Sequence, residues 1–367
     1  MRIGINALYL LPGQVGGTEI YLRSLLGALA GIDGDDEYLI FTNRETGSDL
    51  VPPRSNFEQV PQRVGGTVRA GRIAWEQAVL PVEAARRRLD VLFNPGFTAP
   101  LLCPCPMVTV FHDLQHKSHP EHFRWWDLPF WRLMLFQSAC TSEWLIAVSE
   151  ATRSDLLRYY PVAPGRVRAI PHGVDERFFE IDRRRGGSGP FLLCVSTLHP
   201  HKNLDRLVRA FARFRAARPG IGLVIAGMRG FHAEALERLI AGLDLGDAVR
   251  LTGWIPREEL YALFRDAAAF LYPSTFEGFG LPVLEALAAG LPTACSDIEP
   301  LAGNAGDAAL LFPPEDESAI EAAMMRLTSD AALRDRLAAA GPLRARRFSW
   351  RTAAEATLAA LKQATQM

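Results

Sequence analysis

The chain has 367 residues, more than one hydrophobic core usually serves, so we expect two domains. Its composition is 49% apolar and 22% charged, which is typical of a globular protein. The formal net charge of −1 argues against a nucleic-acid binder that works through overall charge. Any anionic ligand therefore has to be held by a local site.

The cysteines and the apolar runs indicate a protein of a reducing compartment. The five cysteines are scattered and odd in number, which does not suggest a disulfide framework. Cys103 and Cys105 lie close together, but no second pair completes a zinc site. We expect buried, reduced thiols in a cytoplasmic protein. We also expect no secretory leader, because Met1–Asn6 alternates like a first strand, and no membrane-spanning helix, because no apolar run reaches ~18 residues.

The first half of the chain alternates short apolar runs with helix-period segments. Strands are predicted at Arg2–Ala7, Tyr38–Thr42, Val91–Asn94, Met107–Phe111 and Trp144–Val148, and helices at Gly17–Ala30 and Glu150–Tyr159. Ser149 is a suitable N-cap for the second helix. This alternation is typical of a parallel sheet that is covered by helices on both faces.

A charged, glycine-rich stretch, Asp182–Pro190, interrupts this alternation, and a second cycle follows it. Strands are predicted at Phe191–Ser196, Gly222–Ala226, Val249–Leu251, Ala269–Tyr272 and Pro292–Ser296, and helices at Asn203–Arg215, Ala233–Ala241, Arg257–Asp266 and Pro282–Ala289. We therefore expect two doubly wound α/β domains, at residues 1–182 and 190–349, with the linker at 183–189. Ligands of such sheets bind at the carboxyl ends of the strands, which here would face a cleft between the domains. The last helix, residues 350–367, is expected to pack back on the first domain.

The strongest local signal is the stretch Ala269–Gly290, where a buried strand runs into the loop Glu277–Gly280 (EGFG). Pro282 then lies where a helix should begin. The glycines allow backbone N–H groups to approach a ligand, and the helix start adds partial positive charge, so the loop suits a diphosphate. Glu277 and Glu285 are suited to accepting hydrogen bonds from hydroxyls of a sugar and a ribose. The alternative is an ordinary strand–turn–helix with two solvated glutamates.

Glu277 and Glu285, with Gly278–Gly280 between them, resemble the E-x7-E signature of the family-four retaining glycosyltransferases. Further motifs follow in that family's order and rough spacing: Phe111–Asp113, Val148–Glu150, Ile170–Asp175, His201–Asn203, Gly253–Pro256 and Phe348–Trp350. The resemblance covers nearly the whole chain and is strongest to bacterial mannosyltransferases of surface-polysaccharide synthesis. It implies the GT-B fold, in which two Rossmann-like domains face a central cleft. It also implies that the first domain takes the acceptor and the second takes the nucleotide-sugar donor.

The resemblance also implies roles for individual residues. Glu277 would contact the transferred sugar, Lys202 would bind the diphosphate, and His112 would lie beside the transferred sugar, so these three are the expected catalytic residues. Glu285 would bind the ribose hydroxyls. The full set of expected donor contacts is Gly16, Gly17, Thr197, Trp254, Gly278, Phe279, Gly280, Leu281 and Glu285. No metal and no cofactor beyond the nucleotide-sugar substrate are expected.

Other interpretations remain open for several of these residues. His112 suits a satisfied structural histidine, Lys202 a solvated lysine at a helix start, and Gly16 and Gly17 a flexible turn. Thr197 and His201 stand where many family members carry arginine. This departure leaves Lys202 as the main fixed cation of the donor site, with the neighbouring histidines as pH-dependent helpers.

The segment Phe123–Phe136 holds three tryptophans, and a basic run, Arg86–Arg88, lies in the same domain. A helix buried beside the cleft, with a solvated basic turn, is the preferred interpretation. The alternative is a surface for a lipid-linked acceptor, with peripheral contact at the inner face of a membrane.

The predicted activity is retaining transfer of a hexose, mannose from GDP-mannose, to a glycan or lipid-linked oligosaccharide acceptor. Front-face transfer is expected, without attack on Glu277. UDP-, dTDP- and ADP-sugars are alternative donors, and a non-catalytic sugar-nucleotide binding protein or an epimerase or hydrolase is an alternative function. A dinucleotide-dependent dehydrogenase is disfavoured, because Gly13, Gly16 and Gly17 do not have the GxGxxG spacing.

Overall fold

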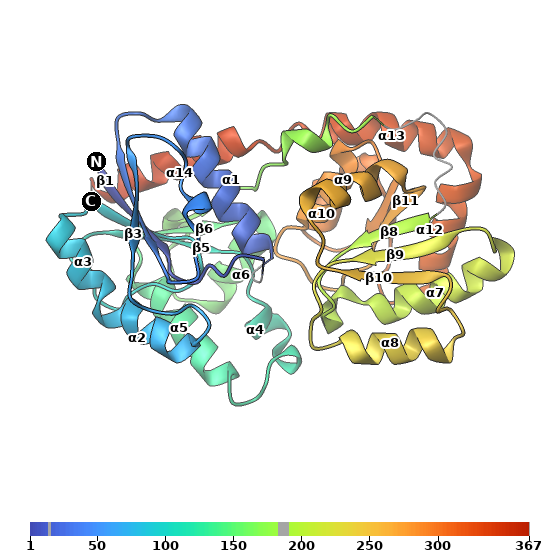
Figure 1. Cartoon of the computed structure of the whole chain (residues 1–367), viewed down its shortest axis with the longest axis horizontal. Coiled ribbons are helices and arrows are strands. Elements are labelled where there is room, and N and C mark those ends of the chain that lie inside the picture. The colour runs from blue at the N-terminus through green and yellow to red at the C-terminus, as the bar shows by residue number, and fades with distance from the viewer. Residues whose placement is uncertain (14–15, 183–190, 367) are drawn as a thin grey trace. The chain divides into compact units, whose positions relative to one another are not determined.

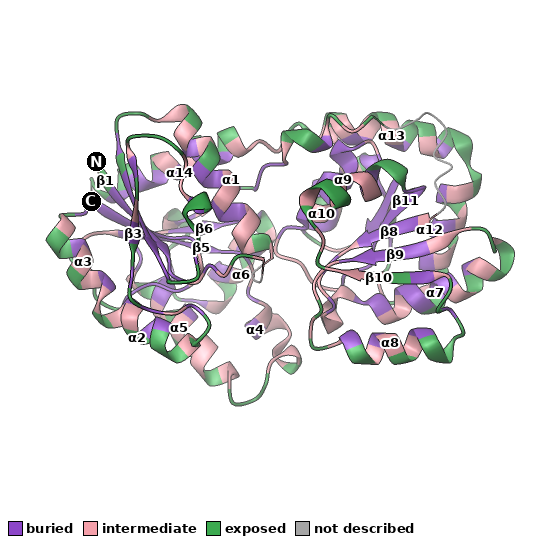
Figure 2. Cartoon of the chain, in the orientation of Figure 1, coloured by how far each residue is buried: buried purple, intermediate pink, exposed green. Residues whose placement is uncertain are grey.

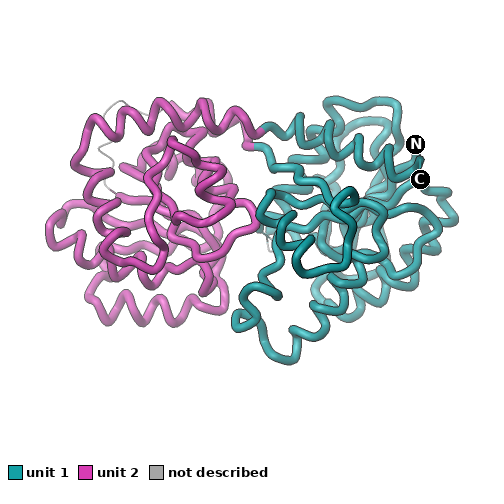
Figure 3. Tube along the Cα trace, turned by 180° about the vertical axis from the view of Figure 1, so that it is seen from behind, with its two compact units in different colours: residues 1–173, 349–367 teal, residues 174–348 magenta. Residues whose placement is uncertain are grey.

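The computed structural model describes residues 1–13, 16–182 and 191–366, so the predicted linker at 183–189 lies outside the described residues (Figure 1). The chain divides into two units, drawn in two colours in Figure 3. Unit 1 consists of Met1–Gly173 and Ser349–Met367, and unit 2 consists of Val174–Phe348.

The division falls earlier in the chain than the boundary expected at 182. Residues 174–182 belong to unit 2, because the Val174 N–H donates to the Phe348 carbonyl over 3.1 Å and the Asp175 carboxylate pairs with Arg257. Ser349 belongs to unit 1 together with the C-terminal helix that follows it.

Unit 1 is built on a parallel sheet, seven-stranded over the described residues, in the order β3-β2-β1-β4-β5-β6-β7. Its strands are Arg2–Ala7 (β1), Glu37–Thr42 (β2), Phe57–Pro61 (β3), Val91–Asn94 (β4), Met107–Phe111 (β5), Trp144–Ala147 (β6) and Val167–Ala169 (β7). β4 and β5 are buried at every position, as expected of strands covered on both faces (Figure 2).

The α-helices of unit 1 include the C-terminal helix. They are Gly17–Ile32 (α1), Arg69–Ala78 (α2), Leu80–Arg87 (α3), Gln115–Ser118 (α4), Leu128–Thr141 (α5), Glu150–Tyr159 (α6) and Trp350–Ala364 (α14). Ser149 caps α6 by accepting from the Thr152 N–H over 3.0 Å. α14 packs against α1 and buries Ala353, Ala360 and Leu361.

Unit 2 is built on a second parallel sheet, six-stranded over the described part of the unit, in the order β10-β9-β8-β11-β12-β13. Its strands are Phe191–Val195 (β8), Gly222–Ala226 (β9), Val249–Gly253 (β10), Ala269–Tyr272 (β11), Thr293–Ser296 (β12) and Leu310–Phe312 (β13). Its α-helices are Leu204–Ala217 (α7), Ala233–Gly242 (α8), Arg257–Asp266 (α9), Leu281–Ala288 (α10), Leu301–Ala305 (α11), Glu317–Ser329 (α12) and Ala331–Ala345 (α13).

The predicted pair of α/β domains with parallel sheets is confirmed. Three strands were missed, β3, β7 and β13, because their sequences are short or interrupted by polar residues. The expectation of uniformly buried thiols is wrong for Cys140, which is exposed on α5, while Cys194 and Cys295 are buried. Among the described residues, the structure contains no helix with both the length and the apolar character needed to cross a bilayer.

The contact between α14 and α1 predicts that the C-terminal helix contributes to the stability of unit 1. Leu361→Ala should lower the free energy of unfolding by about 2–5 kcal/mol, because Leu361 is fully buried. Urea unfolding measures this change. The matched control is Glu355→Ala on the exposed face of α14, where a change of about 0.5 kcal/mol or less is expected. Equal effects of the two substitutions would contradict the packing role.

Candidate functional site

Lys202 ends a short 3-10 helix, Pro200–Lys202, in the loop that follows β8. The next residue, Asn203, has a left-handed backbone with φ 56°, a conformation that asparagine tolerates better than most residues. Its side-chain amide donates to the Pro273 carbonyl over 2.9 Å and to the Pro314 carbonyl over 2.7 Å. These bonds fix the backbone on which Lys202 is carried.

The loop that follows β11 is tied to the Lys202 loop and to α11. The Thr275 N–H donates to the His201 carbonyl over 2.8 Å, and the Ser274 hydroxyl donates to the same oxygen over 3.0 Å. Asn304 of α11 donates to the Phe279 carbonyl over 2.6 Å. The loop therefore holds its shape through bonds to neighbouring segments of unit 2.

Gly280 precedes α10 and requires glycine for two reasons. Its φ is 88°, in the left-handed region, and a Cβ atom there would lie 2.1 Å from the Leu301 side chain. Because no side chain fills this position, the loop can turn sharply from β11 into α10. Pro282 lies in the first turn of α10, as predicted.

Glu277 and Lys202 form an ion pair, with 2.6 Å between Glu277 Oε1 and Lys202 Nζ. The two side chains are only 10% and 13% exposed. Lys202 Nζ also donates to the Tyr272 hydroxyl over 3.2 Å, and burial holds the pKa of Tyr272 well above its usual value. The interpretation of Lys202 and Glu277 as solvated surface residues is therefore wrong.

Glu285 lies on α10 and is 4% exposed, so the alternative of a solvated glutamate is also wrong for it. Its Oε1 atom lies 3.4 Å from Nη1 of Arg257, the first residue of α9. Burial raises the pKa of Glu285 to about 7, although the Arg257 charge opposes this rise. The carboxylate thus shares the region near Arg257 with Asp175, which pairs with the same guanidinium over 2.6 Å.

The remaining predicted donor contacts of unit 2 are spread over its loops. Phe279 is buried, with its ring 6.0 Å from that of Phe348, and Leu281 is buried as the first residue of α10. Gly278 lies in the same loop, and Thr197 is half-buried in the loop after β8. Trp254 is exposed after β10. Among the described residues, neither Trp254 nor Thr197 forms a hydrogen bond or an ion pair with Lys202 or Glu277.

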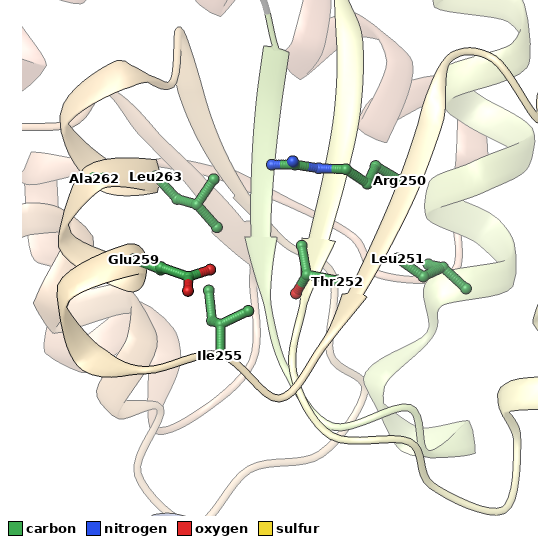
Figure 4. A pocket seen from close by; sticks show the side chains of 7 residues that line it. All are labelled: Arg250, Leu251, Thr252, Ile255, Glu259, Ala262 and Leu263. Atoms are coloured by element: carbon green, nitrogen blue, oxygen red, sulfur yellow. The ribbon is translucent and has the colours of Figure 1, made fainter.

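A pocket of about 500 Å³ lies between β10 and α9 (Figure 4). It is lined by Arg250, Leu251, Thr252, Ile255, Glu259, Ala262 and Leu263. This lining contains none of the predicted site residues, and the pocket is therefore separate from the two glutamates.

His112 belongs to unit 1, where it follows β5. Its Nε2 atom lies 2.8 Å from the Pro95 carbonyl oxygen, which can only accept, so Nε2 carries the proton. The rings of Tyr21, Phe97 and His172 lie 4.9, 5.1 and 5.7 Å from its ring. Burial in these surroundings lowers the pKa of His112 to about 4, in spite of the bond to Pro95. The imidazole is neutral and can accept a hydrogen bond at Nδ1.

Gly16 and Gly17 begin α1 of the same unit. Gly16 is the N-cap, with φ 60°, and its carbonyl accepts from the Glu19 N–H over 3.1 Å. Gly17 is exposed, and a Cβ atom there would meet nothing within 4 Å. The backbone N–H groups at this helix start suit an anion.

A buried polar network lies at the carboxyl ends of β1 and β4. Asn6 donates to Glu76 over 3.0 Å and to Asn94 over 3.1 Å, and the Thr98 hydroxyl donates to Glu76 over 2.9 Å. Burial raises the pKa of Glu76, and Arg72 lies 3.9 Å from its carboxylate. This network was not predicted from the sequence, because nothing in the local pattern of α2 distinguishes Glu76 from a solvated helix residue.

The aromatic segment contradicts the preferred interpretation of a helix buried beside a cleft. Trp125 and Trp126 are 79% and 57% exposed, and Leu133 and Phe136 of α5 are exposed as well. The basic run is partly neutralised, since Arg86 and Arg87 both pair with Glu83.

One cluster among the described residues brings together three groups able to ligate a metal ion: His119, Glu121 and His122 of unit 1, whose ligand atoms lie within 4.8 Å of one another. It includes no predicted donor-site residue. Metal independence of the donor site remains a prediction.

Arg257 and Tyr261 of α9 both contact Asp175 and were not among the predicted site residues. A signal was present, because Asp175 ends the Ile170–Asp175 motif and Arg257 directly follows the Gly253–Pro256 motif. Neither motif by itself indicated that Asp175 and Arg257 would be in contact.

Two family models match the chain. Residues 15–178 match the model described as Glycosyltransferase Family 4, and residues 176–344 match the model described as Glycosyl transferases group 1. The two matches together span residues 15–344, which takes in most of both units.

Individual glycosyltransferases are also similar to this chain. The chain is 30% identical over 414 aligned positions to a D-inositol 3-phosphate glycosyltransferase of Acidothermus cellulolyticus, covering 99% of this chain and 90% of that protein. It is 29% identical over 265 positions to the O-antigen chain mannosyltransferase B of Escherichia coli, covering 70% of each chain. The crystal structure of Anabaena Alr3699/HepE in complex with UDP and glucose matches with a TM-score of 0.77 at 17% identity, over 99% of this chain and 100% of that one. This last likeness shows the fold.

The surroundings of His112 predict that its imidazole stays neutral at physiological pH. Its folded pKa of about 4 lies below the usual 6.5, so its stabilising contribution should be complete above pH ~6.5 and decline as pH falls toward 4. Long-range ¹H–¹⁵N NMR spectra of the histidine rings, assigned with His112→Gln, should show a neutral ring protonated at Nε2 at pH 5.5. A His112 titration with a midpoint near 6.5 would contradict this geometry.

Proposed function

Because the chain belongs to the family 4 glycosyltransferases, we propose that it transfers a hexose from a nucleoside diphosphate sugar to a glycan or lipid-linked acceptor with retention of configuration. GDP-mannose is the proposed donor. The proposed donor site lies in unit 2, around Lys202, Glu277 and Glu285, and needs no metal ion.

The Lys202–Glu277 ion pair is the observation that supports this proposal most directly. A partly buried ammonium group lies 2.6 Å from a carboxylate, beside the loop that leads into α10. Backbone N–H groups at the start of α10 add partial positive charge. A cation and a helix start together suit a diphosphate, and a carboxylate beside them suits sugar hydroxyls.

We propose a transfer step that uses Lys202, Glu277 and the start of α10. The bond between the anomeric carbon and the diphosphate oxygen breaks, and a bond from the acceptor oxygen forms on the same face of the sugar. The acceptor proton passes to an oxygen of the leaving diphosphate. Lys202 and the start of α10 stabilise the charge that develops there, an effect of about 3–4 kcal/mol for one well-placed donor. Glu277 orients the sugar and is not itself attacked.

Mannose is proposed because relatives of this chain carry that specificity in their names, among them the O-antigen chain mannosyltransferase B. The complex of Alr3699/HepE makes UDP the main competing nucleotide. Binding experiments therefore have to identify the nucleotide base of the donor.

A panel of GDP, UDP, dTDP and ADP, titrated into the protein by calorimetry with and without EDTA, tests the donor site. One nucleotide should bind best, unaffected by EDTA, and Glu285→Ala should weaken it at least tenfold, because a carboxylate that accepts from ribose hydroxyls is lost. Lys202→Met should lower kcat of transfer from the matching sugar nucleotide by about 10²–10³-fold.

Arg265→Met, on the exposed side of α9, is the matched control and should leave binding and turnover unchanged. Equal indifference of wild type to all four nucleotides would contradict the proposed donor site. Binding without transfer or donor hydrolysis would instead identify a non-catalytic sugar-nucleotide binding protein.

We further propose that unit 1 makes peripheral contact with an anionic membrane through Trp125, Trp126, Leu133 and Phe136. These exposed side chains lie within or just before α5, and Arg124 and Arg132 lie among them. Tryptophan suits the boundary between lipid headgroups and acyl chains, and arginine is attracted to anionic headgroups. Such contact would bring a lipid-linked acceptor to unit 1.

Co-sedimentation with phosphatidylglycerol vesicles tests the membrane contact. The double substitution Trp125→Ala and Trp126→Ala should reduce the partition coefficient at least tenfold, because two large apolar groups are lost from the contact. The control, Phe231→Ala, removes an exposed aromatic side chain of unit 2 and should have no effect. Unchanged partitioning of the double variant would reject this surface.

A further inference from the structure

Arg257 is held at three points. Its Nη2 atom lies 2.6 Å from Asp175 Oδ2, its Nε atom donates to the Tyr261 hydroxyl over 3.2 Å, and its Nη1 atom lies 3.4 Å from Glu285 Oε1. The guanidinium is planar, so fixing two of its nitrogens fixes the direction of the third. The nitrogen that faces Glu285 is therefore placed by Asp175 and Tyr261.

Asp175 is itself anchored. Its Oδ2 atom accepts from both Arg257 and Tyr261 over 2.6 Å, and its Oδ1 atom accepts from the Arg177 N–H over 3.0 Å. Burial alone would raise the pKa of Asp175, but the hydrogen bonds from Tyr261 and Arg257 hold it below its usual value. Asp175 therefore stays ionised and keeps the guanidinium in place.

Glu285 depends on Arg257 for its negative charge. Within the described residues, the ion pair with Arg257 is the only one that its carboxylate makes. Two carboxylates share this one guanidinium, and the more deeply buried one, Glu285, is the first to bind a proton as pH falls. Loss of a cation near a buried carboxylate usually raises its pKa by about 1–3 units.

Other titratable groups among the described residues of unit 2 do not replace Arg257 as the partner of Glu285. Tyr272 of β11 is buried, with a pKa well above its usual value, and therefore stays neutral. Arg177, which follows Asp175, pairs with Glu258 and stacks on Tyr261. Arg344 of α13 donates to the Asn304 carbonyl.

We propose that Arg257 is a positioning residue for nucleotide recognition: held by Asp175 and Tyr261, it sets the direction and the charge of Glu285. This inference rests on the proposed function, which assigns the ribose hydroxyls to Glu285. A ribose presents two adjacent hydroxyl donors, and an ionised carboxylate of fixed direction accepts both. Arg257 thus acts on the nucleotide through Glu285, without touching it.

The test measures the affinity for GDP and for UDP by calorimetry from pH 5.5 to 8.5. Wild-type affinity should rise with pH and level off above about 7, as Glu285 loses its proton. Arg257→Met should weaken binding at least tenfold at pH 7.5 and move the midpoint of this rise upward by about one pH unit or more. Arg257→Lys keeps the charge and should restore the midpoint, with affinity between the other two.

Arg265→Met is the matched control on the same helix and should reproduce the wild-type profile. A uniform loss of affinity in Arg257→Met, with the wild-type midpoint, would show a purely structural role and overturn the inference.

A second measurement keeps the inference separate from the proposed function. The folded pKa of Glu285 lies above its usual value, so its contribution to stability is full at low pH and lost as pH rises through about 7. Wild type should therefore lose stability to urea relative to Glu285→Gln across that range. In the Arg257→Met background the same loss should be centred at higher pH, and an unmoved centre would overturn the inference even if neither nucleotide binds.

Discussion

A carboxylate that is removed from water needs a cation beside it or a bound proton. Among the described residues of unit 2, Glu277 and Glu285 are two such carboxylates. Glu277 pairs with Lys202 over 2.6 Å, and the Lys202 ammonium would also attract a diphosphate. Glu285 pairs with Arg257, which also pairs with Asp175. The pKa of Glu285 rises to about 7. Burial is the main cause of this rise, and the Arg257 charge opposes it. The loops that carry these groups are held by bonds from Asn203 and Asn304, so the charges are placed before any ligand binds.

In unit 1, the buried polar group His112 is neutral and, among the described residues, has no charged partner. His112 is packed among the rings of Tyr21, Phe97 and His172, and burial keeps it neutral. A neutral imidazole whose Nε2–H is used by the Pro95 carbonyl offers a hydrogen-bond acceptor of fixed direction. Unit 1 thus supplies a neutral polar contact, and unit 2 supplies the charged ones.

The family likeness and the site geometry carry different information. Structures with 17% identity share the fold over the whole chain, so the fold tolerates nearly complete replacement of its residues. The proposed function depends instead on a few side chains at the loops after β8 and β11, and on what those side chains contact. Arg257 illustrates the difference, because its partners Asp175, Tyr261 and Glu285 come from three segments that no single motif contains.

The sequence by itself determined the two α/β domains and the loop Glu277–Gly280 before α10, because hydrophobic period and turn residues act over short stretches of chain. Only the tertiary structure decided that Glu285 is buried beside Arg257, that Trp125 is exposed, and that unit 2 begins at Val174. The contacts responsible join residues far apart in the chain, 75 positions for Lys202–Glu277 and 82 for Arg257–Asp175. Which distant loops meet depends on the order of the strands in the sheet, and strand order is a property of the packed chain that local pattern does not encode.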